Sequence, residues 1–404
     1  MAQPPAISFR HPGYPASARD LLRLSATDGE PAHGIDYNIA LAACGIVACN
    51  RWRDAWFGEE RDAGGGEEAQ DRYRRVPRPE NGILPYKETP YYFFVGDDVG
   101  YKYPVVPSFA HWPFPHDGMP DDWRTLQFPS GSATAVTLPE EPRSALYARD
   151  QGCRVTGYFL GSDIARLVPA QATGWFEANG MQRYCQLQTR ANPIDDEANT
   201  LVLRQDICKI LGEGYLGIVP RAGAQPTAQA QTDGQQAAAP VTPIPSTPPN
   251  TPMHSNQATY PVIHVFIPDE YGELLQIYHN QPLQPSCPGA ASDIAPEFLF
   301  ARFAWAVLSD KHYNFLQCGW LEYRVLILDP ETGERREQDM GREALGHSVR
   351  LFSERSGSSE ASEASDDDEE PGENDDDDSP GQYEESARGR SRWRVPATLS
   401  YHVA

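Results

Sequence analysis

"IDDEANTLVLRQDICKIL", residues 194–211, places a short strand and a helix in direct succession. TLVLR (200–204) is an apolar run that predicts the strand, and the residues after it, QDICKIL, turn helical. Upstream, CRVTG at 153–157 predicts another short strand that ends at a glycine turn. YLGIVPR at 215–221 predicts the strand that closes the unit. We therefore expect a compact unit of strands, loop and helix over residues 144–221.

The N-terminal region, residues 1–143, is rich in proline and aromatic residues. A short helix is expected across Asp36–Trp56, before a stretch of glycine and acidic residues that marks an exposed loop. Residues 91–98 (YYFFVGDD) and 101–109 (YKYPVVPSF) predict short strands. Prolines in the second of these favour sheet edges and irregular pairing.

A composition change separates the two halves of the chain. Residues 222–258 contain Asp233 as their only carboxylate and no Lys or Arg, and they are rich in proline, alanine and glutamine. Such a segment cannot bury enough apolar area to offset its ordering entropy, so we predict a disordered linker. Residues 259–352 are expected to form a C-terminal α/β region that packs on the core, and residues 353–404 an acidic disordered tail with a basic cluster.

The C-terminal region is expected to open with a strand at 259–268 (TYPVIHVFIP), followed by a helical segment at 269–279. A longer helix is predicted within 292–317, where Asp293 can cap the helix and Pro296 can occupy its first turn. Apolar residues recur there at helical spacing, which places this helix against the core. These residues are Phe298, Leu299, Phe303, Ala306 and Val307.

The net charge of -23 resides mostly in the tail. Residues 354–385 contain fifteen Asp or Glu and one Arg, so the remainder of the chain carries only -9. The seven cysteines in a long chain without a signal-like start indicate free thiols. No apolar run reaches 18 residues, which predicts no membrane span, and the N-terminus predicts an intracellular protein of the nucleus or cytoplasm.

Five segments in register carry a resemblance to a known family. They are CRVTG, a segment that ends in LVP, GWFEANGMQRY, IDDEANTLVLRQDI and IVPR, in that order. Residues 153–220 resemble the HNH endonuclease domain of fungal HNH-domain proteins. The resemblance implies an α+β fold in which a ββα-metal (HNH-like) core is embedded between mixed α/β N- and C-terminal regions.

The same resemblance assigns a role to each position of the active site. In the family, a neutral histidine deprotonates water, an asparagine orients that histidine, and ligands one helical turn apart hold a divalent metal ion. Arg166 stands at the base position, and its guanidinium cannot accept a proton. Cys208 and Gly212 stand at the metal-ligand positions, so both are substituted, whereas Asn199 is present.

Replacement groups are scarce within the nuclease-like segment, because no histidine lies between residues 117 and 253. A rearranged site could draw on His111 or His116 as the base. Asp163 and Glu213, with Cys153 and Cys208, are the candidates for a different metal site.

The sequence therefore predicts a catalytically impaired nuclease that binds nucleic acid, with no cofactor. The cations expected to contact phosphates are Arg154, Arg166, Arg183, Arg204 and Lys209. One alternative is an active HNH endonuclease that uses a divalent metal in a rearranged site. Another is a protein-interaction factor that binds basic proteins through residues 354–385. We also expect Arg166 to take the place of the ion and to pair with Asp163, Glu213 or a phosphate.

Overall fold

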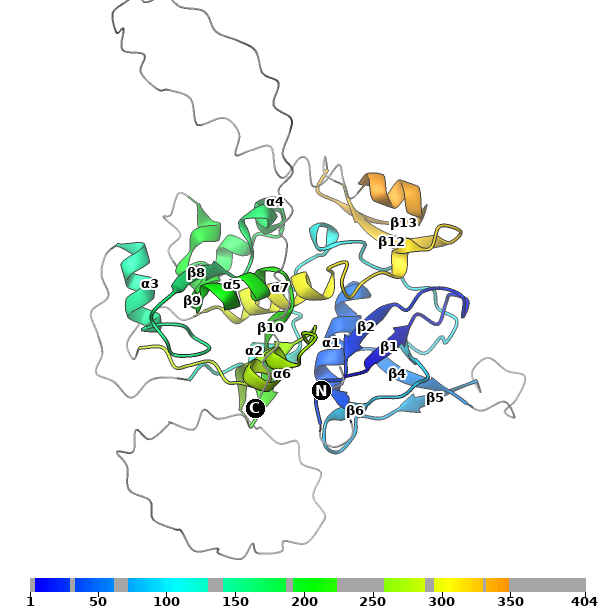
Figure 1. Ribbon diagram of the computed structural model, residues 1–404. Helices are drawn as coiled ribbons and strands as arrows, with labels where there is room; N and C mark the ends of the chain where they lie inside the picture. The colour runs from blue at the N-terminus through cyan, green and yellow to red at the C-terminus, as the bar shows by residue number, and fades with distance from the viewer. Residues whose placement is uncertain are drawn as a thin grey trace, which may run out of the picture. The chain divides into compact units, whose positions relative to one another are not determined.

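Figure 1 shows the computed structural model of the chain. The structure describes residues 4–29, 33–61, 72–129, 141–186, 192–223, 258–287, 294–329 and 332–348. The chain divides into the units Met1–Glu360 and Ala361–Ala404, and all described residues belong to the first. The predicted linker (apart from its end residues), the acidic tail, the basic cluster and the capping role of Asp293 lie outside the described residues.

A five-stranded sheet occupies the N-terminal region, in the order β2-β1-β7-β4-β5. Its central strand β7 reads YYFFV and is buried along its whole length, as expected for a strand covered on both faces. The strands are β1 (Ala6–Arg10), β2 (Leu22–Ser25), β4 (Ala55–Glu60), β5 (Tyr73–Val76) and β7 (Tyr91–Val95). Only the β1–β7 pair is parallel. The strand predicted at 91–98 is thereby confirmed.

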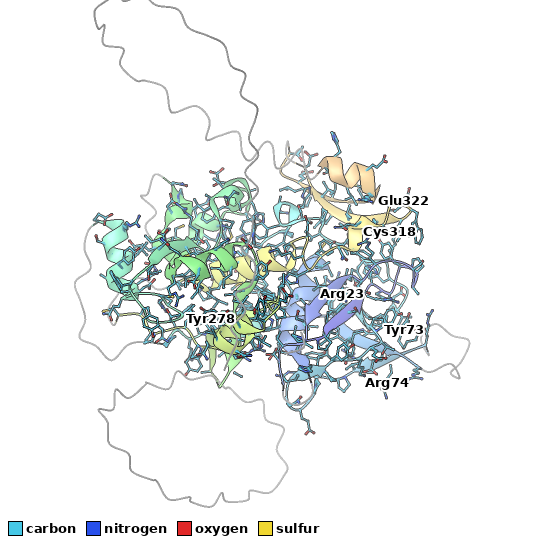
Figure 2. The ribbon with its side chains drawn as sticks, viewed as in Figure 1. Arg23, Tyr73, Arg74, Tyr278, Cys318 and Glu322 are labelled. Carbon is cyan, nitrogen blue, oxygen red and sulfur yellow. The ribbon has the colours of Figure 1, made fainter. Side chains whose placement is uncertain are left out.

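Charged and polar side chains line the two edges of this sheet. Figure 2 labels Arg23 on β2, and Tyr73 and Arg74 on β5. Arg74 pairs with Glu59 of the neighbouring strand at 2.9 Å. Such charges protect an edge against pairing with another chain. A separate two-stranded sheet joins β3 (Gly34–Asp36) to β6 (Ile83–Pro85).

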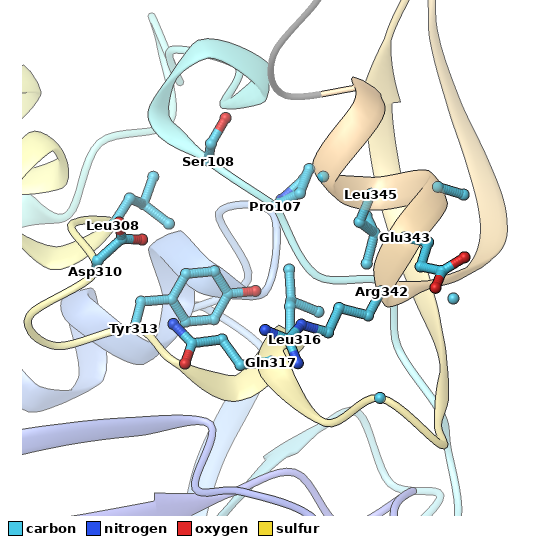
Figure 3. A pocket seen from close by; sticks show the side chains of 14 residues that line it. Pro107, Ser108, Leu308, Asp310, Tyr313, Leu316, Gln317, Arg342, Glu343 and Leu345 are labelled. Atoms are coloured by element: carbon cyan, nitrogen blue, oxygen red, sulfur yellow. The ribbon is translucent and has the colours of Figure 1, made fainter.

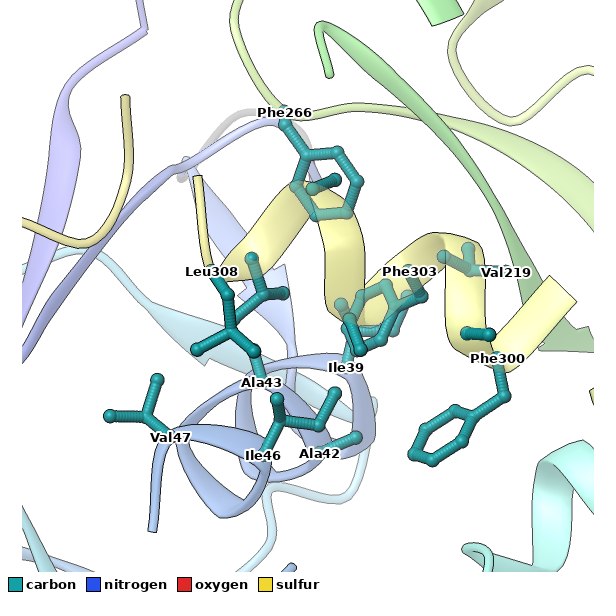
Figure 4. Close-up of a cluster of buried hydrophobic side chains, with 14 of the residues drawn as sticks. Ile39, Ala42, Ala43, Ile46, Val47, Val219, Phe266, Phe300, Phe303 and Leu308 are labelled. Carbon is teal, nitrogen blue, oxygen red and sulfur yellow. The ribbon is translucent and has the colours of Figure 1, made fainter. Parts of the chain in front are cut away.

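Two apolar helices, α1 (Tyr37–Val47) and α7 (Pro296–Val307), pack against each other in the core. Figure 4 shows Ile39 and Ile46 of α1 beside Phe300 and Phe303 of α7. Asp36 caps α1 by accepting hydrogen bonds from two backbone N–H groups of its first turn. Pro296 occupies the first turn of α7, which confirms that prediction.

The predicted extension of α1 to Trp56 is wrong. Cys49 and Asn50 adopt positive φ angles of 57° and 67°, which a right-handed helix cannot continue through. The chain turns there and enters β4 at Ala55. The strand predicted at 101–109 is also wrong: this segment makes only a single bridge, between Val105 and Val325, which agrees with its proline content.

The region of interest is an antiparallel hairpin followed by a helix. β8 (Ser162–Arg166) pairs with β9 (Thr200–Arg204), so that Arg166 lies opposite Thr200. α5 (Gln205–Gly212) follows β9 directly and packs against both strands. The strand and helix predicted for 200–211 are confirmed. α3 (Pro142–Asp150) contacts β9, and α4 (Thr173–Ala178) lies in the connection between the two strands.

The segment 153–157, predicted as a strand, forms a turn instead. The Gly157 N–H donates to the Cys153 carbonyl at 2.8 Å, and Gly152 and Gly157 have positive φ angles of 139° and 74°. A glycine at each end of a five-residue run favours this turn over extended pairing.

The strand predicted at 215–221 is confirmed as β10 (Leu216–Ala222), but its partner lies beyond the predicted linker. β10 pairs along its whole length with β11 (Thr259–Val265), the strand predicted to open the C-terminal region. The predicted boundary after residue 221 therefore falls at the tip of a hairpin. The regions on either side of it pack together, as expected.

The remaining elements surround these sheets. They are α2 (Asp121–Arg124), α6 (Glu273–Tyr278), the antiparallel pair β12 (Glu322–Leu328) and β13 (Arg335–Gly341), and a helical segment at 342–348. The helix predicted within 269–279 is confirmed as α6. The architecture is thus mixed α+β. Within the described ranges, no helix combines the length and apolar character needed to cross a bilayer.

Candidate functional site

Three of the predicted site positions face one cavity, the Arg166 pocket, which has a volume of about 360 Å³. Arg166 ends β8, and Cys208 and Gly212 lie one helical turn apart on α5. The remaining wall is formed by Ile164, Ala165, Pro169, Ala170, Gln171, Leu211, Arg302 and Trp305. Among the described lining residues there is no carboxylate and no imidazole, while two are arginines.

Arg166 pairs with neither of its expected partners. Its Nε donates to Asp195 Oδ1 at 2.6 Å, and about two fifths of each side chain is exposed. Asp163 lies instead 3.6 Å from Arg143. The position of Asp195, in the turn that precedes β9, explains the difference, because Arg166 faces the start of β9 across the hairpin. This ion pair is exposed and is therefore worth less than about 1 kcal/mol.

Asn199 holds the loop of the hairpin together. Its Oδ1 accepts from the Val168 N–H at 2.9 Å, and its Nδ2 donates to the carbonyls of Val168 and Ile194 at 3.1 and 2.7 Å. The side chain is fully buried. Every polar atom of the amide is thus used on backbone groups, which fixes the chain on both sides of the Arg166 pocket.

Cys208 presents a partly buried thiol. Burial raises the pKa of its thiol to about 11, so the sulfur remains protonated at neutral pH. The thiol points toward the Leu203 carbonyl at 3.6 Å. Gly212, at the end of α5, leaves open space where a side chain would begin. That position therefore lacks a ligand but has room for one.

Arg302 was missed by the sequence analysis. It projects from α7 into the wall of the Arg166 pocket and is only 2% exposed. Its Nη2 donates to the Leu211 carbonyl near the end of α5, and its Nε has no hydrogen-bond partner among the described residues. Burial lowers the pKa of Arg302 to about 10, so the group remains cationic at neutral pH.

No ion pair compensates this buried charge within the described ranges. An unpaired charge in the interior costs free energy of folding, so the presence of Arg302 at this place requires a physical reason. The sequence also indicates that Arg302 is buried. In "FLFARFAWAV" (298–307), Arg302 falls three residues after Leu299 and four before Ala306, within the helical face assigned to the core.

Trp305 lies one turn beyond Arg302 on α7, and both line the Arg166 pocket. The indole is half-buried and contacts Phe109 edge-on at 5.0 Å between ring centroids. The pocket therefore combines two guanidinium groups with an aromatic wall, which suits an anion attached to a ring.

The other predicted phosphate contacts are spread over different surroundings. Arg154 is fully buried, and its Nη1 lies 3.0 Å from Asp150, so it is not a surface contact in this structure. Arg204 pairs with Asp206 at 2.6 Å. Arg183 and Lys209 are exposed, but neither lines the Arg166 pocket.

The two histidines proposed as replacement bases lie elsewhere. His111 is buried beside Ser108, and burial lowers its pKa to about 4. His116 approaches the Tyr184 hydroxyl at 2.9 Å. Neither residue lines the Arg166 pocket. The structure therefore offers no base from these positions.

The groups considered for a rearranged metal site do not converge as ligands. Across the described residues, the set of Asp, Glu, His and Cys close enough to share an ion is Asp28, His264 and His279, far from the predicted one in sequence. Cys153 is buried, and Glu213 lies at the C-terminal cap of α5. Neither Asp163 nor Glu213 lines the Arg166 pocket.

The Asp28 cluster, defined here as Asp28, Asp36, Arg221, His264 and His279, is an ion-pair network. Arg221 donates to Asp28 at 2.7 Å and to Asp36 at 2.7 Å, so a permanent cation already bridges the two carboxylates. His279 Nε2 donates to Asp28 at 2.9 Å, while its Nδ1 accepts from a backbone N–H. Burial opposes ionisation of Asp28, but the His279 hydrogen bond and the Arg221 charge hold its pKa well below the usual value.

A larger cavity of about 920 Å³ lies beside the 342–348 helix. Figure 3 shows Tyr313, Ser108 and Leu345 around it. The Tyr313 hydroxyl is buried and has no hydrogen-bond partner among the residues that the structure describes. None of the predicted site residues lines this cavity, and its carboxylates, Asp310 and Glu343, make it a poor match for an anion.

Comparisons with protein-family models, with curated proteins and with solved structures found no match to this chain.

Proposed function

We propose that this chain is an HNH-like protein whose former catalytic pocket now binds a phosphate group of nucleic acid without hydrolysing it. The observation that carries the proposal is the composition of the Arg166 pocket: two guanidinium groups, a protonated thiol, and neither imidazole nor carboxylate among its described lining residues.

The proposed loss of hydrolysis follows from the chemistry of the side chains. An arginine cannot act as a general base, and the Cys208 thiol has no imidazole or carboxylate beside it among the described lining residues to complete a metal site. Gly212 supplies no donor atom. These three substitutions remove the base and both ligands that an HNH-type reaction requires.

Binding of a phosphate group is supported by the buried guanidinium of Arg302. A phosphate in the pocket would compensate its charge, and Arg166 could share one of its remaining N–H donors, since only Nε is directed at Asp195. Arginine is suited to phosphate because its planar fork presents several N–H donors at once. The residues 144–225 carry eight basic and eight acidic groups, so a local pocket explains binding better than a broad basic surface.

Binding of fluorescently labelled DNA and RNA strands, measured by anisotropy between 50 and 200 mM salt, tests the proposal. We expect a shallow salt dependence, with a slope of about -1 to -2, because only one or two phosphates are neutralised. Arg302→Met should abolish most of the binding, whereas Arg183→Ala, an exposed cation outside the pocket, should leave it nearly unchanged. A steep slope, or equal losses from both variants, would assign binding to a diffuse surface instead.

Hydrolysis is tested separately with plasmid and single-stranded DNA. We expect no cleavage with magnesium, manganese, nickel or zinc. Metal-dependent nicking that disappears in Arg166→Ala or Asn199→Ala would show that the pocket is still catalytic.

The proposed HNH relationship has its own test. The triple variant Arg166→His, Cys208→His, Gly212→Asp returns a base and two ligands one turn apart, and the open space at Gly212 accepts the new side chain. We expect calorimetry to detect divalent-metal binding in this variant. Adding Arg302→Met should tighten that binding, because a cation is removed from the pocket wall. Absence of metal binding in both variants would contradict the assigned positions.

A further inference from the structure

We propose that the Arg166 pocket selects a terminal phosphate of a nucleic-acid strand over an internal phosphodiester. This inference rests on the proposed function and names the part of the strand that the pocket binds. It starts from the placement of Arg302 and Trp305, which α7 presents to the pocket one turn apart.

The depth of Arg302 favours a chain end. Arg302 is one of the residues that line the pocket and is almost entirely buried, so a phosphate must enter the cavity to approach it. An internal phosphate is joined to a nucleotide on each side, and both would have to pass the rim with it. A terminal phosphate brings one nucleotide, and a cavity of about 360 Å³ is at the small end of ligand sites.

Charge favours the same ligand. A phosphate monoester carries about -1.5 to -2 at neutral pH and has three free oxygens, whereas an internal diester carries a single charge. The pocket wall presents the uncompensated cation of Arg302, with Arg166 at the rim. A dianion therefore gains more than a monoanion from the same two groups.

Trp305 provides the place for the attached nucleoside. Its half-buried indole lines the pocket one helical turn from Arg302. Aromatic stacking holds a base with little regard to its identity. We therefore expect selection for the phosphorylated end and little selection for sequence.

The experiment compares one single-stranded oligonucleotide sequence in three forms: with a 5′-phosphate, with a 3′-phosphate, and with hydroxyl groups at both ends. Binding to the full chain is measured by anisotropy, with an internal label. We expect one phosphorylated form to bind at least tenfold more tightly than the hydroxyl form, and the arm that does so identifies the end. Inorganic phosphate and a nucleoside 5′-monophosphate should compete.

Variants test phosphate binding and the selection of chain ends separately. Arg302→Met should erase the difference between the three forms, Arg302→Lys should restore part of it, and Trp305→Leu should weaken the phosphorylated form. Arg183→Ala should leave the binding of all three forms nearly unchanged. Thermal unfolding in inorganic phosphate provides a second readout, since the ion should raise the Tm of the wild type but not of Arg302→Met.

Equal affinity for all three forms, still lost in Arg302→Met, would overturn the selection of chain ends while leaving phosphate binding intact. Failure of every oligonucleotide and of inorganic phosphate to bind would overturn the proposed function itself.

Discussion

Arg221 and Arg302 are both largely buried, but their surroundings differ in one respect. Arg221 lies between the carboxylates of Asp28 and Asp36, within 2.7 Å of each. Arg302 donates to a backbone carbonyl and makes no ion pair among the described residues. Removing one partner of a compensated buried cation leaves a charge unpaired, which is strongly destabilising. The buried cation of Arg302, which has no counter-charge among the described residues, is the basis of the proposed phosphate site.

Breaking the compensated network should produce the largest effect. Asp28→Asn keeps the shape of the side chain but removes the charge that Arg221 and His279 share. We expect the free energy of unfolding to fall by about 3–5 kcal/mol in denaturant titrations. Asp163→Asn, in an exposed pair with Arg143, is the matched control and should cost less than about 1 kcal/mol. Similar losses from the two variants would refute the distinction.

Removing the uncompensated cation of Arg302 should cost little or no stability. Arg302→Met replaces a buried charge with an apolar chain of similar length, so we expect a free energy of unfolding within about 1 kcal/mol of the wild type, or above it. The stabilisation by phosphate should vanish in the variant. A tenfold excess of ligand over its Kd is worth about 1.4 kcal/mol in the wild type. A loss of about 3 kcal/mol or more without ligand would show that Arg302 has a structural partner after all.

The pH dependence of unfolding should also distinguish the Asp28 cluster from the Arg166 pocket. The pKa of Asp28 is depressed in the folded chain, so its contribution is fully present above about pH 5 and declines as the pH falls below the unfolded value of about 4. We expect Asp28→Asn to unfold with a weaker dependence on pH between about 4 and 2 than the wild type. Arg302→Met should keep the wild-type dependence, since no carboxylate of the described ranges pairs with Arg302. Unfolding monitored by circular dichroism measures both.

The smallest effect is expected for Arg166→Ala. The sequence predicts that Arg166 replaces an ion structurally, but in the structure it forms an exposed pair with Asp195. Its removal should therefore change the free energy of unfolding by no more than about 0.5 kcal/mol. Phosphate binding should weaken less than in Arg302→Met. A large loss of stability would restore the structural role.

Apolar periodicity and the position of a proline predicted several strands and helices correctly. The strand and helix at 200–212 and the long helix α7 follow from apolar periodicity and from Pro296. The error at 153–157 arose because a short apolar run between glycines is compatible with either a strand or a turn. The error at Trp56 arose because Cys49 and Asn50 both adopt a left-handed conformation, which asparagine favours more than most residues but cysteine does not.

The site was predictable only in part, for a physical reason. Arg166, Cys208 and Gly212 come from one hairpin and its helix, so a motif within about fifty residues identifies all three. Arg302 reaches the same pocket from α7, about ninety residues further along the chain. The Asp28 cluster likewise joins residues from the N-terminal and C-terminal halves. Contacts of this kind are set by tertiary packing, which no local pattern encodes.

The hairpin of β10 and β11 has a consequence for protein engineering. The Gly223 N–H donates to the Ala258 carbonyl, so these two residues lie side by side. The predicted linker between them therefore joins two neighbouring points of the hairpin. Replacing it with a turn of about four residues should stabilise the chain by about 2 kcal/mol through the smaller loop-closure entropy. The same position is suited to the insertion of a reporter domain whose own ends lie close together.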